Sequence, residues 1–282
     1  MIVVTGASGQ LGSAVVEKLL DRTSADQVAV SVRAPEKLAE LSERGVRVRR
    51  GDFTDAASLE AAFEGASGVL VVSMDAVGEE VVQAQRTAAA AAEAAGAKRV
   101  LYTSHVGASA TSAFPPMIDH AATEEALQNA GVTFLRNGFY ATTVSRILQP
   151  ALETGELRVP EDGPVAWTTH DDLAEAAARI LLDGGFGGLT PPLTGPAAVD
   201  FRQIAAIASD VTGRAIRHVV VSDDKYRDGM LAAGLPPEAA DMMVGMFVAS
   251  RRGDFGPADP ALATLLGRPA TSIEDYLAET QA

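Results

Sequence analysis

A glycine-rich segment near the start of the chain limits the folds open to it. The apolar, β-branched run Ile2–Thr5 reads as a strand, and a helical stretch follows after Gly6-Ala7-Ser8-Gly9-Gln10-Leu11-Gly12. Gly6 suits a tight turn, Gly9 lets backbone amides approach a diphosphate, and Gly12 lets the helix pack close to the strand. The helix start then offers free N–H groups and the positive end of its dipole to an anion. A plain glycine-rich turn is the weaker alternative, because the segment lies between a strand and a helix.

Short β-branched runs alternate with helical stretches over the first half of the chain, as in successive βα units. The pattern predicts strands at 2–5, 27–33, 46–50, 68–73, 98–104 and 132–136, with helices at 10–21, 36–44, 58–63, 79–95 and 117–130. Beyond about Asn137, strand-like pieces at 165–168 and 217–221 lie among helices at 173–182, 201–212, 239–248 and 272–280. We therefore predict an α/β fold. Residues 1–136 form a Rossmann-type doubly wound parallel sheet, and 137–282 form mainly a small C-terminal α/β substrate domain, with some segments returning to the core.

Charge and composition exclude several classes of function. The 282 residues carry a net charge of −14, so bulk electrostatics do not favour a nucleic-acid backbone as partner. No apolar run approaches the roughly 18 residues of a membrane span, and the first residues lack the features of a secretory signal. The chain has no cysteine, and its histidines lack ligand spacings with carboxylates. We expect no nucleic acid, no membrane, no metal and a cytoplasmic location.

The end of the second strand indicates which dinucleotide the glycine-rich loop binds. Many NAD sites place an Asp or Glu there, about 20 residues after the loop, on the ribose 2′-hydroxyl. This chain has Arg33 instead. A guanidinium pairs with a 2′-phosphate that a carboxylate would repel, so we predict NADP(H), with a solvated arginine as the alternative. Asp52 and Phe53, just past the third strand, are expected beside the adenine, although Asp52 also suits a turn cap.

Four segments together resemble the NmrA-like atypical short-chain dehydrogenase/reductases. They are the loop at 5–12, Ser31-Val32-Arg33, Tyr102-Thr103-Ser104 and, most specifically, Leu135-Arg136-Asn137-Gly138-Phe139-Tyr140. The resemblance covers essentially the whole chain, and within the family it points to the NADPH:quinone oxidoreductase type 2 and triphenylmethane reductase group. It implies that NADP(H) lies across the C-terminal edge of the sheet and contacts Gly6, Ala7, Ser8, Gly9, Gln10, Leu11, Arg33, Asp52, Phe53, Ser73, Thr103, Asn137, Gly138, Phe139 and Tyr140.

The Tyr-x-x-x-Lys dyad that many short-chain dehydrogenases use as a proton donor is missing. The corresponding stretch reads His120-Ala121-Ala122-Thr123-Glu124, and no other Tyr-x-x-x-Lys occurs. Hydride transfer to a ketone creates a strongly basic alkoxide that needs a positioned acid. Transfer to a quinone creates a phenolate-like anion whose conjugate acid has a pKa of about 10. The absence favours quinone or dye reduction, and it fits equally a protein that binds NADPH without turnover.

His120, Ser104 and Tyr140 are the candidate catalytic residues. His120 is expected near the nicotinamide or a quinone oxygen as a hydrogen-bond donor or proton source, with a pKa suited to that work. Its structural alternative is a helix-start histidine packed against Glu124. Ser104 ends the fifth strand, where ligands bind in open sheets, and either holds a substrate carbonyl or caps local backbone.

These observations predict an NADPH-dependent oxidoreductase that transfers hydride directly to a small quinone-like aromatic acceptor, without flavin or metal. Two alternatives stay open. One is an NADP(H)-binding redox sensor that acts through a protein partner, and the other is a tailoring reductase of a secondary-metabolite pathway. The sequence leaves the oligomeric state open, with a homodimer among the alternatives.

Overall fold

Parallel strands form the central sheet of the computed structural model, which describes residues 1–281. The strand order is β3-β2-β1-β4-β5-β6-β8, and every neighbouring pair is parallel. The strands are β1 (Ile2–Thr5), β2 (Val28–Val32), β3 (Arg47–Arg50), β4 (Gly68–Val71), β5 (Arg99–His105), β6 (Val132–Asn137) and β8 (Gly188–Leu189). The order reverses at β1, which lies between β2 and β4, and such a reversal opens a ligand crevice at the carboxyl ends of the strands. The predicted Rossmann-type sheet is confirmed.

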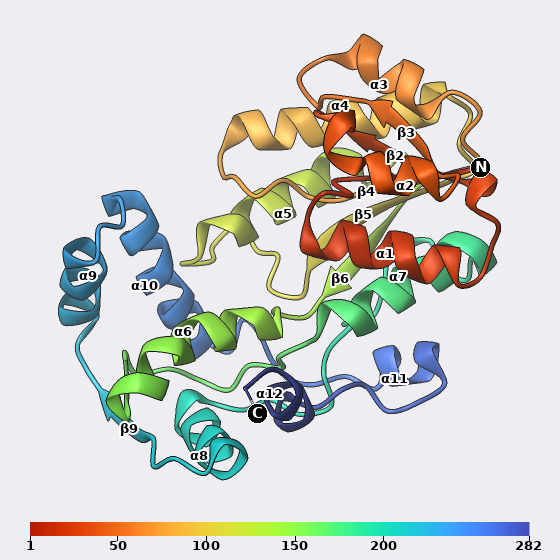
Figure 1. The fold of residues 1–282 in the computed structure, drawn as a ribbon. Helices are drawn as coiled ribbons and strands as arrows, with labels where there is room; N and C mark the ends of the chain where they lie inside the picture. The colour runs from red at the N-terminus through yellow and green to blue at the C-terminus, as the bar shows by residue number, and fades with distance from the viewer. Residues whose placement is uncertain (282) are drawn as a thin grey trace.

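Helices cover both faces of this sheet (Figure 1). One layer contains α1 (Gln10–Leu20), α7 (His170–Asp183) and α11 (Ala261–Leu266), and the other contains α3 (Ala56–Phe63), α4 (Glu79–Ala94) and α5 (Pro115–Leu127). Side chains of β1 alternate between the two layers: Ile2 and Val4 pack in the first, Val3 in the second. Because both faces are covered, β1 and β4 are buried along their whole length.

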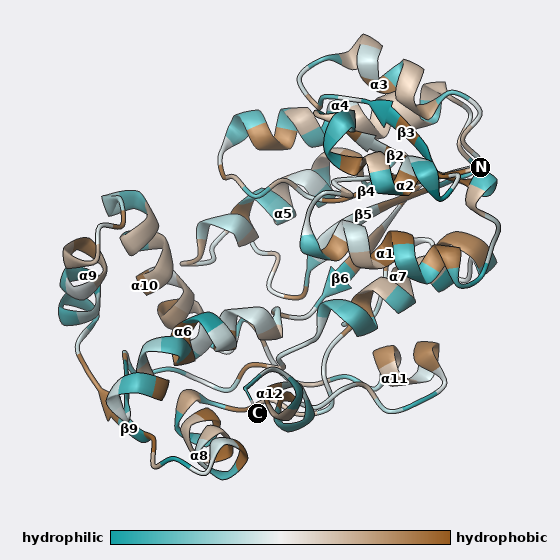
Figure 2. Cartoon of the chain, in the orientation of Figure 1, coloured by the Kyte–Doolittle hydropathy of each residue, from teal (hydrophilic) through white to brown (hydrophobic). Residues whose placement is uncertain are grey.

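Helix α1 shows how the sequence produces these layers. Its buried residues Leu11, Val15, Val16 and Leu19 recur at helical spacing, so that one side of the helix is apolar. Figure 2 shows hydrophilic residues interspersed with them along α1. Between β2 and β3 the predicted helical stretch at 36–44 is found as a 3-10 turn η2 (Pro35–Leu38) that continues directly into a short α-helix α2 (Ala39–Glu43). Another 3-10 turn, η1 (Ala25–Gln27), precedes β2.

The second half of the chain builds its own hydrophobic core beside the carboxyl ends of the strands (Figure 1). Large buried side chains such as Trp167, Phe201 and Phe247 fill this core. Its elements are α6 (Ala141–Thr154), β7 (Glu156–Val159), α8 (Phe201–Thr212), β9 (Arg217–Val220), α9 (Asp223–Ala232), α10 (Pro237–Arg251) and α12 (Ile273–Gln281). Strands β7 and β9 pair in parallel as a separate small sheet. Helices α7 and α11 return to the hydrophobic core of the first helix layer, and β8 pairs with β6 at the edge of the central sheet.

The strand expected at 165–168 is wrong. Three N–H groups of this segment donate to three different parts of the chain: Val165 to the carbonyl of Val199, Ala166 to that of Phe255, and Thr168 to that of Phe139. Only isolated bridges result, because no single strand runs beside the segment.

Over the described residues, none of the helices combines the length and the apolar character that crossing a membrane requires.

Candidate functional site

The turn after β1 is built around two close backbone contacts. Gly6 has a φ of +61°, a conformation that side chains other than glycine rarely adopt, and its carbonyl accepts a 2.9 Å hydrogen bond from the Gly9 N–H. A Cβ on Gly12 would lie 2.7 Å from the Gly6 carbonyl carbon and 3.0 Å from the Cα of Ala7. Only a glycine at position 12 therefore lets α1 start directly beneath this turn.

The N-terminus of α1 fits a diphosphate. Gly9 is the N-cap and has no side chain to satisfy the first-turn N–H groups, which lack intrahelical partners in any helix. The first turn also has no acidic residue. Unsatisfied donors and the positive end of the helix dipole therefore meet at a point free of competing carboxylates, the arrangement that binds phosphates elsewhere.

Arg33 and Asp52 lie at the neighbouring ends of β2 and β3. The Arg33 side chain is exposed and has no ion pair within the described chain. Asp52 accepts hydrogen bonds at Oδ1 from the backbone N–H (3.0 Å) and hydroxyl (2.8 Å) of Thr54. These bonds hold the pKa of Asp52 below its ordinary value, and Arg33 adds to the effect. Asp52 therefore caps a turn, as its structural alternative predicted, and Phe53 beside it packs partly against the core.

Lys37 is a second cation near this end of the sheet. It lines a groove of about 190 Å³ between α1 and the η2–α2 segment, together with Ala7 and Ser13 of the glycine-rich region. No ion pair of Lys37 occurs in the described chain. Its position four residues after Arg33 was visible in the sequence, but the sequence does not reveal that the short η2 turn brings it back to Ala7.

The hydroxyls of Thr5 and Thr103 hold the central strand ends together. Thr5 Oγ1 accepts a 2.8 Å hydrogen bond from the Val72 N–H, and Thr103 Oγ1 accepts one of the same length from the Ser73 N–H. Thr103 also donates to the Ser73 hydroxyl at 3.1 Å. The Thr103 side chain is therefore engaged within the protein.

The end of β6 presents a tightly packed turn. The Gly138 N–H donates to the carbonyl of Leu193 at 2.8 Å, and a Cβ there would collide with the Thr168 hydroxyl. Asn137 is buried, and its Oδ1 has no hydrogen-bond partner among the described residues. A buried amide oxygen without a partner is costly, so Asn137 fits a site where a ligand supplies the missing donor. The next residue, Phe139, is 7% exposed and packs in an aromatic cluster.

Tyr140 follows this turn and is half-buried against the His170 ring, with a centroid distance of 4.3 Å. Burial raises the pKa of the Tyr140 phenol. The hydroxyl is therefore protonated at neutral pH and suits hydrogen bonding better than proton donation.

His120, on α5, pairs with Tyr102 of β5. Its Nδ1 lies 2.9 Å from the Tyr102 hydroxyl, and its ring stacks on that of His105 with a centroid distance of 6.2 Å. Burial lowers the pKa of His120 to about 4. The imidazole is therefore neutral at pH 7, which contradicts the expectation of a pKa suited to storing a proton. A neutral imidazole still donates a hydrogen bond from one of its nitrogens.

Ser104 is engaged by a buried carboxylate. Its Oγ donates to Glu124 Oε1 at 2.6 Å, so it caps no local backbone. The same carboxylate accepts from Arg136 through Nε at 3.0 Å and Nη2 at 2.5 Å. Glu124 is thus paired with Arg136 and not with His120 as the structural alternative supposed.

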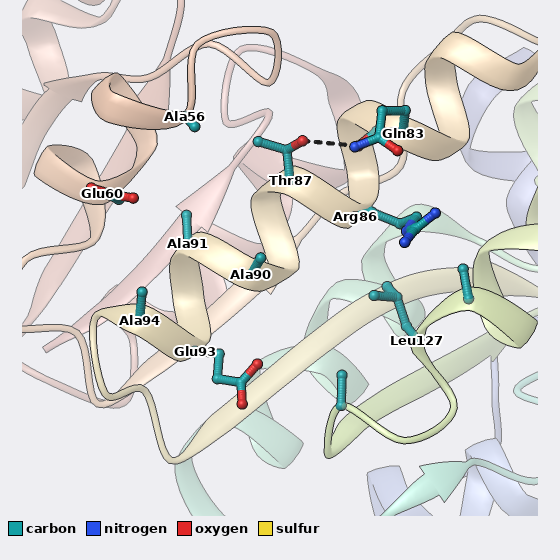
Figure 3. Close-up of a pocket in the computed structure, with 12 residues that line it drawn as sticks. Ala56, Glu60, Gln83, Arg86, Thr87, Ala90, Ala91, Glu93, Ala94 and Leu127 are labelled. Carbon is teal, nitrogen blue, oxygen red and sulfur yellow. Dashed lines mark hydrogen bonds between the residues drawn. The ribbon is translucent and has the colours of Figure 1, made fainter.

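A shallow groove of about 480 Å³ lies away from the strand ends (Figure 3). Alanines of α3, α4 and α5 line much of it, and Glu60, Arg86 and Glu93 stand around them. It contains none of the residues at the carboxyl ends of the strands, so we do not place the reaction there. Among the described residues, no His, Asp or Glu cluster suited to a metal ion occurs.

Comparison with known proteins agrees with this geometry. A model of the NmrA-like family matches residues 1–277. The chain belongs to the NmrA-like family. Quinone oxidoreductase 2 of Escherichia coli (strain K12) is 34% identical over 278 residues, 98% of this chain and 96% of that protein.

Two solved structures match this chain over the full length of both chains. Escherichia coli NADPH-dependent quinone oxidoreductase, complexed with NADPH, has a TM-score of 0.93 at 32% identity. Citrobacter sp. triphenylmethane reductase, complexed with NADP(H), has a TM-score of 0.91 at 31% identity. Both superpose on the Rossmann-type sheet and on the second core.

In this NmrA-like chain the fold gathers most residues that the sequence singled out at one edge of the sheet. The glycine-rich turn, Arg33, Asp52, Ser73 and the turn after β6 follow the carboxyl ends of parallel strands, and Thr103 lies within β5 near its carboxyl end. Sequence reasoning missed Lys37 and the Glu124–Arg136 pair as members of this region. Glu124 was noted only as the residue in place of a lysine, and its partner on β6 is a tertiary contact without a local signal.

Proposed function

We propose that the chain is an NADPH-dependent oxidoreductase that transfers hydride directly to a small quinone-like aromatic acceptor. The observation that carries the proposal is the set of groups at the carboxyl ends of the parallel strands. Within the described chain, an uncapped helix start follows β1, an arginine without an ion pair follows β2, and the unpartnered oxygen of Asn137 lies at the end of β6. The names of the full-length relatives, a quinone oxidoreductase and a triphenylmethane reductase, support the same class of acceptor.

Different residues at the carboxyl ends of the strands bind different parts of NADPH. The segment 6–11 takes the diphosphate through its backbone N–H groups, and Arg33 with Lys37 takes the 2′-phosphate. Asp52 and Phe53 border the adenine, while Ser73, Thr103 and residues 137–140 border the nicotinamide end. The bound dinucleotide supplies the hydride, and the protein supplies orientation and a dry surrounding.

Acceptor chemistry explains why the site works without the Tyr-x-x-x-Lys dyad. A reduced quinone carries a phenolate-like charge, and a hydrogen bond from a neutral imidazole stabilises it without prior proton storage. His120 is the group that we propose for this contact, with Tyr102 holding its Nδ1. Ser104, bonded to Glu124, then orients the site and does not donate to substrate. Tyr140, protonated and half-buried, is proposed to border the acceptor.

The remaining parts of the proposal concern the surroundings of the site. We assign the NADP(H)-binding domain to residues 1–136 and substrate binding mainly to 137–282, whose aromatic core suits a flat acceptor. We also propose a cytoplasmic location, with which the absence of cysteine agrees. A homodimer is the assembly to test by size-exclusion chromatography with light scattering.

A two-step assay tests the function. Fluorescence titration first measures NADPH and NADH binding, and absorbance at 340 nm then follows NADPH with and without 1,4-benzoquinone and a triphenylmethane dye. We expect tighter binding of NADPH than of NADH and acceptor-dependent decay. Binding without decay for any acceptor would favour the redox sensor, and decay only with elaborate polycyclic quinones would favour the tailoring reductase. Absence of binding would refute the assignment of the glycine-rich turn.

A further inference from the structure

Glu124 joins three elements of the site. From α5 it accepts hydrogen bonds from Ser104 on β5 at 2.6 Å and from Arg136 on β6 at 3.0 and 2.5 Å. It is 9% exposed. Both of its carboxylate oxygens are therefore engaged in a largely water-free place.

The position of these partners gives the contact its significance. Ser104 and Arg136 are register neighbours on β5 and β6, and the next pair along the two strands is His105 and Asn137. His120 lies one helical turn before Glu124 on α5, in contact with Tyr102. The carboxylate thus fixes the helix that carries His120 to the strands that carry Asn137 and the turn at 138–140.

The energetics of buried ion pairs indicate that the Glu124–Arg136 contact fixes the arrangement of α5 against the strands and adds little net stability. Desolvation of both charges offsets much of their attraction, and well-packed apolar residues often replace such pairs without loss of stability. Removal of one partner, by contrast, is destabilising, because it leaves an uncompensated charge between the packed elements. An ion pair with bidentate geometry therefore specifies one arrangement of α5 against β5 and β6.

We infer that Glu124 is a positioning residue for hydride transfer, which holds His120 and the end of β6 in register through Ser104 and Arg136. The inference deepens the proposed function and rests on it for its kinetic part. Glu124 itself does not contact the substrate and acts only through its neighbours. Glu124 occupies the position of the lysine in the Tyr-x-x-x-Lys dyad. It orients His120 and the end of β6, and it supplies no proton.

The pKa of His120 reports whether Glu124 holds α5 against the strands, and it can be measured without turnover. The titratable and charged groups around its ring are Tyr102 and His105 from β5, Asp119 and Glu124 from its own helix, and Arg136 from β6 beside His105. Burial lowers the pKa of His120. If α5 lifts from the strands, water reaches the ring and this pKa rises toward its ordinary value of about 6.5.

The test compares Glu124→Gln with Glu125→Gln, which removes the same charge from the adjacent exposed residue of α5. For Glu124→Gln we expect kcat for benzoquinone to fall by about 10- to 100-fold, as small misplacements of reacting groups do. The Kd for NADPH stays within about twofold of the wild-type value, because the residues proposed to bind the diphosphate and the 2′-phosphate follow other strands. The NMR-monitored pKa of His120 rises. Glu125→Gln leaves all three quantities unchanged.

Other results would overturn the inference. A lowered melting temperature with unchanged kcat and unchanged His120 titration would make Glu124 purely structural. If Glu124→Gln does not fold, Ser104→Ala and Glu124→Asp replace it. Both keep the charge pair and are expected to give smaller falls in kcat, and a larger effect of Ser104→Ala than of Glu124→Asp would make Ser104 the catalytic group instead. If the wild-type protein binds NADPH without turnover, the proposed function fails, and the His120 titration alone decides whether Glu124 positions that side chain.

Discussion

The substitution Arg33→Ala tests the choice of cofactor most sharply. Arg33 is exposed at the end of β2 without an ion pair in the described chain, so its removal leaves no buried charge and should not affect folding. A hydrogen bond between charged groups contributes about 1.5–3 kcal/mol. We expect the lower part of that range, about 1.5–2 kcal/mol, because water screens the side chain and Asp52 lies nearby.

That free energy predicts a 10- to 30-fold weaker Kd for NADPH, since about 1.4 kcal/mol corresponds to tenfold. NADH has no 2′-phosphate, so its Kd should change by less than about threefold. Fluorescence titration of both nucleotides measures the two constants. The control Arg50→Ala removes an exposed arginine of the next strand that pairs with Asp55 at 3.2 Å, and it should affect neither nucleotide. Equal losses for NADPH and NADH in Arg33→Ala would refute the assignment of Arg33.

Three further predictions concern the glycine-rich turn, His120, and the half-buried Asp162, which accepts a 2.8 Å hydrogen bond from the Phe201 N–H at the start of α8. Gly12→Ala places a Cβ 2.7 Å from the Gly6 carbonyl carbon, so it should lower the melting temperature and abolish NADPH binding; a variant that binds normally would contradict the packing of α1. Because burial lowers the pKa of His120 to about 4, kcat should be flat from pH 6 to 8. An inflection near pH 6.5 that His120→Ala removes would show that the ring titrates. Burial raises the pKa of Asp162 to about 6, so folding favours its protonated form and this residue's contribution to stability falls as pH rises from about 4 to 6. Denaturant unfolding of Asp162→Asn should therefore show a stability gain over wild type that grows across this window, and a constant difference would refute it.

The sequence predicted the first half of the fold because its information is local. Each strand there is a short apolar run, and the glycine-rich turn marks the first βα unit. The second half depends on pairings between distant segments, such as Glu156 of β7 with Arg217 of β9. Helix α6 had a local signal in the spacing of Val144, Leu148 and Ala151, but Pro150 inside it obscured the pattern. Strand β8 has two exposed residues and no pattern to find.

The candidate site shows the same division. In a parallel sheet the strand ends meet at one edge, so Arg33, Asp52 and Asn137 could be brought together from sequence alone. The Glu124–Arg136 pair could not, because it depends on which side of α5 docks on the sheet. The pKa of His120 could not be predicted either, since it follows from burial by neighbours that are distant in the sequence.

The proposed reaction is direct hydride transfer from NADPH to an aromatic acceptor. A single-turnover stopped-flow experiment tests this transfer: enzyme in excess over NADPH, which is deuterated at one or the other C4 position, is mixed anaerobically with excess benzoquinone, and absorbance at 340 nm is followed. We expect one exponential decay, a primary isotope effect for only one of the two deuterated forms, and no flavin signal at longer wavelengths. Tight binding of NADPH with no decay for any quinone or dye would contradict the proposed reaction.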